Sequence, residues 1–160
     1  STSNTRGRRS RSCGARRSRS IRMTTNERRV RVEWAGREKG FEGRGSGAGH
    51  VILDSGSKEG PSPTEALLMS LATCMGVDVQ MILEKGRVPF EAIVIEVRGE
   101  RAPEPPRRFL SLHLDIRVKG PAEGDLPKIE RAVQLSRETY CSVFHTLRPD
   151  LEVEISVARE

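Results

Sequence analysis

The sequence predicts an α+β fold with antiparallel sheets and one long apolar helix. Two observations carry this prediction. Several short stretches alternate between polar and apolar residues, as half-buried strands do, and one long apolar stretch has helical spacing. The order is three strands, a helix, two strands, a helix and a strand. Consecutive strands can therefore pair as hairpins, with the helices segregated from them, instead of alternating one by one with helices in a parallel sheet.

The basic character of the chain is confined to its first 22 residues. The formal net charge of the 160 residues is +6, but residues 1–22 hold eight arginines and no acid. Removing these eight from the 28 Lys and Arg residues leaves 20 basic against 22 acidic groups in residues 23–160, a formal net charge of −2. We therefore expect a single near-neutral domain over 23–160 and do not expect it to bind nucleic acid.

Residues 1–22 are rich in Arg, Ser and Gly and almost free of apolar side chains, which predicts a disordered tail. Such a segment is typical of a transit peptide or of a nucleic-acid-binding arm. It also fits upstream sequence in front of a protein that starts at Met23, and we favour this third interpretation.

The first strands are expected at residues 28–34, in the glycine-rich stretch 41–49, and at 50–54. The glycines between 43 and 49 resemble a dinucleotide-binding loop, but that loop leads directly into a helix. Here a strand follows, so we predict no bound cofactor.

The most apolar stretch, residues 61–83, predicts a helix that begins at two prolines. Proline is tolerated there because the backbone N–H groups of a helix's first turn have no partner within the helix, so the missing N–H of proline costs no hydrogen bond. Its apolar positions recur every three or four residues: Leu67, Leu68, Leu71, Ala72, Met75, Val79 and Ile82. No run of about 18 apolar residues occurs, so we expect a core helix and no membrane span. Cys74 lies in the middle of it.

After this helix, residues 91–101 and 109–119 alternate and predict an antiparallel hairpin with one charged face towards water. Residues 126–140 have the apolar periodicity of an amphipathic helix. A short helical turn at 140–147, which contains Cys141, and a final strand at 151–157 complete the domain.

The pattern around the two cysteines resembles that of the OsmC/Ohr family, the osmotically inducible and organic hydroperoxide resistance proteins. Residues 60–74, Gly-Pro-Ser-Pro-Thr-Glu-Ala-Leu-Leu-Met-Ser-Leu-Ala-Thr-Cys, are followed 67 residues later by Cys141 in Tyr-Cys-Ser-Val. The resemblance implies an intertwined homodimer, with sheets wrapped around two crossing central helices. It also implies a peroxidase that reduces hydroperoxides in stress defence with electrons from an external dithiol.

The resemblance further implies roles for four residues. Cys74 would be the peroxidatic cysteine and Cys141 the resolving one, while Glu65 would position a catalytic arginine, with Arg44 as the first candidate. The chain departs from the peroxidase pattern in having Thr64 ten residues before Cys74, where those members have the glutamate. Arg107 and Arg108 are alternative candidates for the arginine, Asp78 shares the helix face of Cys74, and Ser142 stands where many members have proline.

Three alternatives remain open at this point. The cysteines could be ordinary packed side chains, or Cys74, Cys141 and His145 could bind a metal ion, although we predict none. A groove at the dimer interface could bind an apolar small molecule without catalysis. Its expected lining is Met69, Met75, Met81, Phe109 and Phe144. Three cysteines and no secretory signal favour a reducing compartment, and we expect a cytoplasmic protein.

Overall fold

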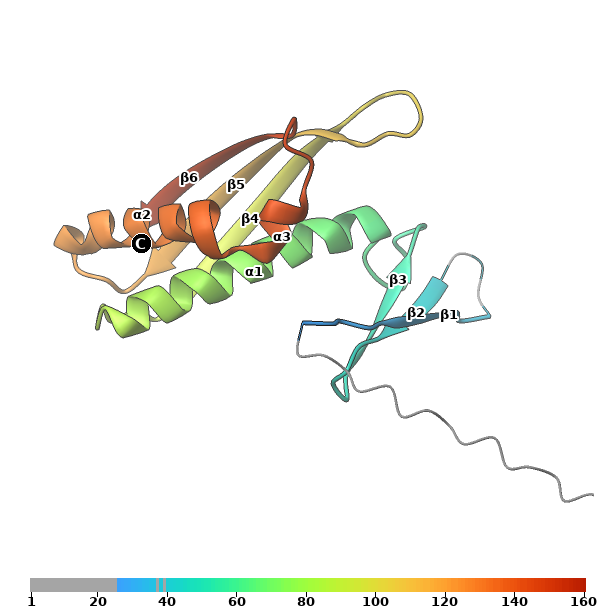
Figure 1. Ribbon diagram of the computed structural model, residues 1–160, viewed down its shortest axis with the longest axis horizontal. Coiled ribbons are helices and arrows are strands. Elements are labelled where there is room, and N and C mark those ends of the chain that lie inside the picture. The colour runs from blue at the N-terminus through green and yellow to red at the C-terminus, as the bar shows by residue number, and fades with distance from the viewer. Residues whose placement is uncertain (1–25, 37, 39) are drawn as a thin grey trace, which may run out of the picture.

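The computed structural model of the protein describes residues 26–160, except 37 and 39. The expectations for the tail 1–22 and for a start at Met23 lie outside these residues. The described chain forms two three-stranded sheets and a group of helices (Figure 1), which is the predicted α+β architecture.

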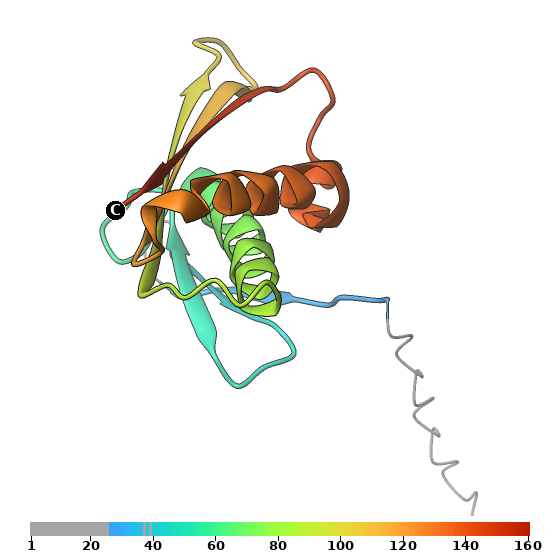
Figure 2. The same cartoon turned by 90° about the vertical axis from the view of Figure 1, so that its left-hand side faces the viewer.

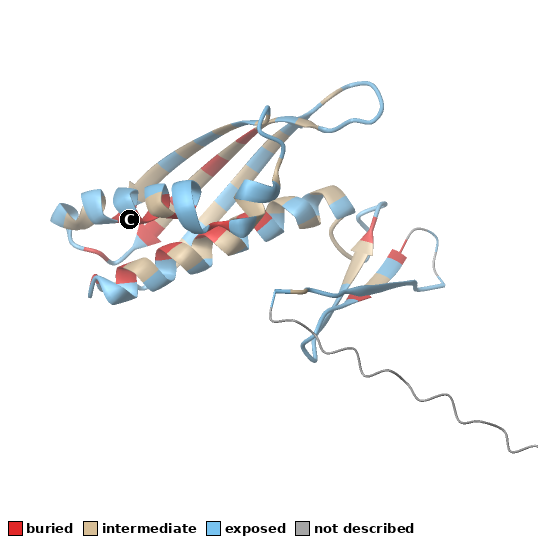
Figure 3. Cartoon of the chain, in the orientation of Figure 1, coloured by how far each residue is buried: buried red, intermediate tan, exposed pale blue. Residues whose placement is uncertain are grey.

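The N-terminal sheet consists of β1 (Arg31–Trp34), β2 (Gly40–Arg44) and β3 (His50–Asp54), paired antiparallel in chain order. The three strands agree with the prediction, but the expected half-burial of the first is wrong. All four residues of β1 are exposed, because this sheet extends away from the rest of the chain (Figures 1 and 3).

The long helix α1 spans Pro63–Lys85 and begins with a capping box. The backbone N–H of Glu65 donates to the Ser62 hydroxyl at 3.3 Å, and the Glu65 carboxylate accepts from the backbone N–H of Ser62 at 2.7 Å. These bonds satisfy two of the helix's unpaired donors, while Pro63 has no N–H to satisfy. The helix ends where Gly86 donates to the carbonyl of Ile82.

The second sheet contains β4 (Ala92–Arg101), β5 (Phe109–Lys119) and β6 (Glu152–Arg159). The predicted antiparallel hairpin of β4 and β5 is present. The expectation of antiparallel pairing throughout is wrong for β6, which lies parallel to β5. The chain between β5 and β6 crosses the sheet through helices before it returns, and such a crossover brings the next strand back in the same direction.

The helices of that crossover are α2 (Leu126–Leu135), preceded by a 3₁₀ turn at Glu123–Asp125, and α3 (Ser142–Thr146). The amphipathic helix was expected to run to residue 140 without a break. Instead it ends at Leu135 and continues as a π-helical turn, Ser136–Tyr140, which leads directly to Cys141.

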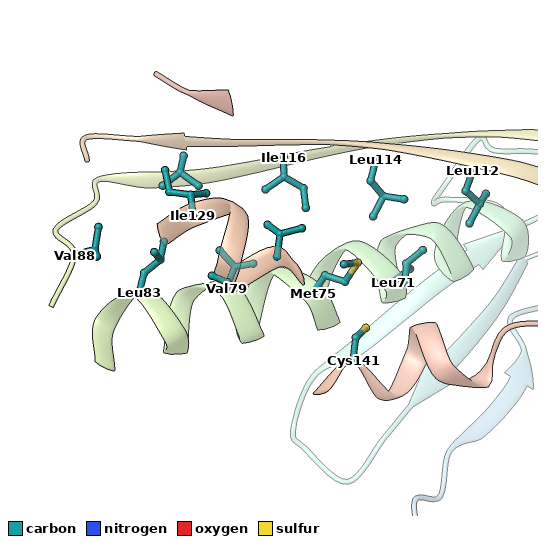
Figure 4. Packing of buried hydrophobic residues seen from close by; sticks show 13 residues of the cluster. Leu71, Met75, Val79, Leu83, Val88, Leu112, Leu114, Ile116, Ile129 and Cys141 are labelled. Carbon is teal, nitrogen blue, oxygen red and sulfur yellow. The ribbon is translucent and has the colours of Figure 1, made fainter. Parts of the chain in front are cut away.

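The core lies between the second sheet and the two helices α1 and α2, which pack on the same side of it (Figure 2). Figure 4 shows side chains of α1 facing those of β5 and α2. The α1 residues recur every fourth position, which places them on one face of the helix. The main contributors are Leu71, Met75, Val79 and Leu83 from α1, Leu112, Leu114, Ile116 and Val118 from β5, and Ile129, Ala132 and Val133 from α2.

The helix α1 is long and apolar enough to cross a membrane, by length and composition alone. The stripe formed by Leu71, Met75, Val79 and Leu83 is, however, fully packed against the sheet and α2. We therefore regard α1 as the core helix of the domain, as the lack of a run of about 18 apolar residues predicts.

Candidate active site

The fold brings two cysteines that are far apart in sequence to the same place. Cys74 lies in the middle of α1 and is half-buried, whereas Cys141 lies at the junction before α3 and is fully buried. Their Sγ atoms, together with a carboxylate oxygen of Asp78, all lie within 4.8 Å of one another. Figure 4 shows Cys141 reaching from the start of α3 towards α1.

The π-helical turn fixes the position of Cys141. The backbone N–H of Cys141 donates to the carbonyl of Ser136 at 2.9 Å, which closes the turn. Its backbone is extended, and its Sγ accepts from the N–H of Phe144 at 3.4 Å, so the thiol caps α3. A π-helical turn inside an α-helix is often found at functional sites. In this protein the π-helical turn places the Cys141 thiol next to Cys74 and Asp78 of α1.

The same turn also places a hydroxyl on Asp78. Ser136 is fully buried and donates to Oδ2 of Asp78 at 2.7 Å. Asp78 lies one turn after Cys74 on α1, as the sequence predicts. The partnership with Ser136 was not predicted, because the two residues are 58 positions apart and no local pattern links them.

Burial raises the pKa of the Cys141 thiol to about 11. The N–H of Phe144 opposes this by donating to the sulfur, while Cys74 and the Asp78 carboxylate raise the pKa further. A thiol with this pKa is protonated at neutral pH, and only the thiolate is a strong nucleophile.

Cys74 opens onto a groove of about 620 Å³ between β3 and α1. The groove lining has no charged side chain among the described residues. It consists of Val51, Leu53, Pro61, Ala66, Met69, Ser70, Thr73 and Cys74. An apolar molecule that enters this groove would meet the thiol of Cys74.

The carboxylate of Glu65 is held by hydrogen bonds at the start of α1. It accepts hydrogen bonds from the hydroxyl and the backbone of Ser62, and from the hydroxyl of Ser57 at 3.4 Å. The bonds from Ser62 hold the pKa of Glu65 below its usual value. Glu65 thus serves as a helix cap within the chain, and its role in positioning an arginine stays a prediction.

The three candidate arginines lie on the surface. Arg44 forms an ion pair with Glu42 on β2. Arg108 pairs with Asp150 at 3.3 Å, and Arg107 lies in the exposed turn between β4 and β5. Which arginine serves Cys74 therefore stays a prediction.

Two other expectations need correction. His145, the possible third metal ligand beside the two cysteines, is exposed, with its ring edge-on to that of Phe144. Within the described chain, the residues that could together hold a metal ion are Cys74, Cys141 and Asp78. Asp78 is thus the third possible ligand, in place of the expected His145. Of the five residues expected to line a groove at the dimer interface, Met75 is fully buried in the core of the single chain, whereas Met69 and Met81 are more than half exposed.

Comparisons with known proteins identify the family. The family model described as OsmC-like protein matches residues 56–156, a range that contains both Cys74 and Cys141. Protein YhfA of Escherichia coli K12 is 38% identical over 117 residues, which cover 71% of this chain and 84% of YhfA.

Solved structures give the same result for the fold. A hypothetical protein of Aquifex aeolicus superposes with a TM-score of 0.71 at 31% identity, covering 84% of this chain and 98% of its own. An organic hydroperoxide resistance protein OsmC of Legionella pneumophila superposes with a TM-score of 0.60 at 13% identity, covering 85% and 99%. The second similarity, at this identity, concerns the fold alone.

Proposed function

The chain belongs to the OsmC/Ohr family of OsmC-like proteins, and from that membership we propose that it is a thiol-dependent peroxidase that reduces organic hydroperoxides through Cys74 and Cys141. The observation that carries the proposal is the proximity of the two thiols. They come from segments 67 residues apart in sequence, and their sulfurs lie within 4.8 Å of each other. A resolving thiol must be able to reach the sulfur of the attacking thiol, and this separation allows it.

In the proposed reaction, the Cys74 thiolate attacks one oxygen of the hydroperoxide. The O–O bond breaks, the departing alkoxide takes up a proton to become the alcohol, and Cys74 becomes a sulfenic acid. Cys141 then attacks the Cys74 sulfur and a disulfide forms, while the proton of the Cys141 thiol passes to the departing hydroxide, which leaves as water. An external dithiol restores both thiols by exchange, so that its two electrons reduce one hydroperoxide.

The groove beside Cys74 supports an organic hydroperoxide as the substrate. Its lining side chains are mostly apolar, and they would take the alkyl part of the substrate while the peroxide group meets the sulfur. Hydrogen peroxide has no alkyl part and would gain nothing from this lining. We therefore propose a preference for bulky organic hydroperoxides.

The proposal keeps Glu65 and Arg44 as the residues that assist Cys74, by analogy with the family. The structure describes a single chain, in which Arg44 lies on the outlying N-terminal sheet. We propose a homodimer in which this sheet packs against a second copy. The support is the apolar surface that the single chain leaves exposed, chiefly Val32, Trp34, Phe41, Val51, Met69 and Met81.

The proposed cellular setting is the cytoplasm, where thiols are kept reduced and dithiol reductants are available. Both described cysteines are free, which agrees with such a setting. Stress defence is the role that follows from the removal of organic hydroperoxides.

The test follows the consumption of cumene hydroperoxide in the presence of dithiothreitol. The unchanged protein should consume it in many turnovers, and Cys74→Ser should reduce consumption to the rate of the mixture without protein. Cys13→Ser is the matched control and should retain full activity. Equally slow consumption by the unchanged protein and by Cys74→Ser would exclude the peroxidase.

A second candidate function is the binding of an apolar small molecule without catalysis. It is favoured by the absence of any charged side chain in the described lining of the groove, since a peroxidatic thiol needs a nearby cation. In that case, the unchanged protein and Cys74→Ser would bind an environment-sensitive apolar dye equally, while neither consumes hydroperoxide. Met69→Glu should then reduce binding of the dye.

A further inference from the structure

Three groups that can each become anionic meet at the centre of the site. These are the thiols of Cys74 and Cys141 and the carboxylate of Asp78, whose sulfur and oxygen atoms lie within 4.8 Å of one another. Cys141, before α3, is fully buried, Asp78 on α1 is half-buried, and Cys74 borders the groove. The peroxidase chemistry described above uses the two thiols and leaves Asp78 without a role.

The cluster has no cation of its own. In the described residues, none of the ion pairs involves Asp78, and its hydrogen-bond donor is the neutral hydroxyl of Ser136. Anionic groups removed from water are costly unless an opposite charge compensates them. A bound cation would supply that charge at the point where the three groups converge.

The donor set specifies the kind of cation. Two thiolate sulfurs and one carboxylate oxygen suit Zn²⁺ and its soft analogues, whereas Mg²⁺ and Ca²⁺ prefer oxygen ligands alone. Around a tetrahedral Zn²⁺ with Zn–S bonds of about 2.3 Å, the two sulfurs would lie about 3.8 Å apart. Small side-chain rotations therefore suffice to bring the atoms from their present separation to that geometry.

A supporting contact and an open position complete the site. Ser136 donates to Oδ2 of Asp78 at 2.7 Å, and a hydrogen bond of this kind orients a carboxylate ligand. Cys74 borders the groove, so a water molecule can reach the fourth position from that side. Three protein ligands plus one water are typical of reactive zinc sites.

We propose that the dithiol form of this protein binds one zinc-class divalent cation between Sγ of Cys74, Sγ of Cys141 and a carboxylate oxygen of Asp78. Each thiol releases its proton to solvent as its bond to the cation forms. The site exists only in the reduced protein, because a disulfide between the two cysteines removes both thiolates. The proposal goes beyond the peroxidase function and does not depend on it.

The test is a titration of the full-length chain with Co²⁺, a spectroscopic substitute for Zn²⁺, without oxygen and after reduction by a phosphine. Cys13 lies outside the described residues and is replaced by Ser in every protein tested. One equivalent of Co²⁺ should produce thiolate-to-cobalt charge-transfer absorption and the visible bands of four-coordinate cobalt. Added Zn²⁺ should displace it and abolish both signals.

Variants then identify the ligands. Cys74→Ser and Cys141→Ser should each reduce the charge-transfer absorption, and Asp78→Asn should weaken Co²⁺ binding at least about 10-fold. Ser136→Ala should weaken it about 10-fold through the lost orientation of Asp78. Glu84→Gln is the matched control, because Glu84 is an exposed acid on the same helix, and it should leave the affinity unchanged.

A second measurement needs no variant and guards against variants that fail to fold. One equivalent of Zn²⁺ should slow alkylation of Cys74 and Cys141 together in the otherwise unchanged chain. Absence of cobalt–thiolate absorption in the reduced protein, or an unchanged affinity in folded Asp78→Asn, overturns the proposal. So does alkylation of both cysteines at the same rate with and without Zn²⁺.

The failure of this proposal can be told apart from the failure of the peroxidase function. The metal titration contains no peroxide, and the peroxidase assay can be run on metal-free protein with a chelator. If both hold, one equivalent of Zn²⁺ should inhibit hydroperoxide consumption, because the cation occupies the thiolate that attacks the peroxide.

Discussion

At the scale of single residues, the two cysteines differ in their surroundings. Cys74 is half-buried and borders the groove, whereas Cys141 is fully buried and has a pKa raised to about 11. A peroxide that enters the groove meets Cys74 first, and Cys141 is reached through Cys74. This asymmetry favours Cys74 as the attacking thiol and Cys141 as the resolving thiol in the proposed reaction.

The order of the two thiols can be tested by trapping. In Cys141→Ser, one equivalent of cumene hydroperoxide should leave Cys74 as a sulfenic acid, because no second thiol is available to condense with it. Dimedone labelling followed by mass spectrometry should then find the adduct on Cys74. The unchanged protein should give a disulfide between Cys74 and Cys141 with little adduct. An adduct on Cys141 in Cys74→Ser, formed at the same rate, would contradict the assigned order.

Asp54 organises the turn that leads from β3 into α1. Its buried carboxylate accepts hydrogen bonds from the backbone N–H groups of Gly56, Lys58 and Glu59 at 2.8, 3.1 and 3.3 Å. The bond from Gly56 is the main cause of the lowered pKa of Asp54. Because the pKa of Asp54 is lower in the folded protein than its usual value of 3.8, the ionised carboxylate stabilises the fold at pH values above 3.8. This contribution disappears as the pH falls through the lowered pKa.

The melting temperature should therefore decrease as the pH drops from above to below 3.8, in part through Asp54. Asp54→Asn should make the decrease of the melting temperature at acid pH shallower. It should also lower the melting temperature at neutral pH, because the substitution removes the ionised carboxylate that accepts the three hydrogen bonds. Thermal unfolding followed by circular dichroism over a pH series checks both effects. An identical pH profile in the variant would contradict this role of Asp54.

At the scale of elements, two residues just before α1, Gly60 and Ser62, fix where the helix starts. Gly60 lies so close to β3 that a Cβ added to it would be 2.1 Å from the carbonyl oxygen of Ile52. Ser62 then caps the helix together with Glu65. Since Cys74 lies on α1, the direction in which this helix leaves β3 sets the position of the thiol relative to the groove.

Gly60→Ala should destabilise the fold, because the added methyl group collides with backbone that cannot move aside easily. A cost of about 1–3 kcal/mol in the free energy of unfolding is expected from overpacking. Gly45→Ala is the matched control, because a Cβ at Gly45 meets nothing within 4 Å. Urea unfolding of the two variants checks the difference. Equal stability would mean that the contact at Ile52 relaxes without cost.

Ser62→Ala should lower the free energy of unfolding by about 0.5–2 kcal/mol, the usual effect of losing an N-cap. Ser70→Ala is the control on the same helix, since the Ser70 hydroxyl is exposed and donates only to the carbonyl of Ala66. Urea unfolding should show Ser70→Ala within about 0.5 kcal/mol of the unchanged protein. A larger loss in Ser70→Ala than in Ser62→Ala would contradict the capping role.

At the scale of the whole molecule, the single chain leaves many large apolar side chains exposed. Much of the N-terminal sheet and of the outer side of α1 is coloured as exposed or intermediate in Figure 3. Trp34 is 62% exposed, and Val32, Phe41 and Val51 on the same N-terminal sheet are exposed as well. The outer side of α1 exposes Met69, Val77 and Met81. Apolar surface on this scale marks an interaction surface, and a second copy of the chain is the proposed partner.

Light scattering in solution should therefore give twice the 17.8 kDa mass of one chain. Trp34→Asp should shift the protein towards the monomer, because burying a charge at the interface is costly. Glu33→Gln, at the neighbouring exposed position, is the control and should leave the mass unchanged. A monomer in the unchanged protein at all concentrations tested would contradict the proposed dimer.

The strands and helices could be predicted from the sequence because each depends on a local period. Alternation located the first strand and strands of the second sheet, and the spacing of apolar residues around Cys74 located α1 to within two residues. The family could be predicted as well, because the segment that leads to Cys74 and the segment around Cys141 are both contiguous in sequence.

The tertiary structure decided what depends on contacts between distant segments. It determined the parallel pairing of β6, the distance between the sulfurs of Cys74 and Cys141, and the hydrogen bond from Ser136 to Asp78. The π-helical turn before Cys141 leaves no periodic signal, since it shifts the helix register by a single residue. Local periodicity specifies how each segment folds, whereas the packing of α2 and α3 against α1 determines which side chains meet.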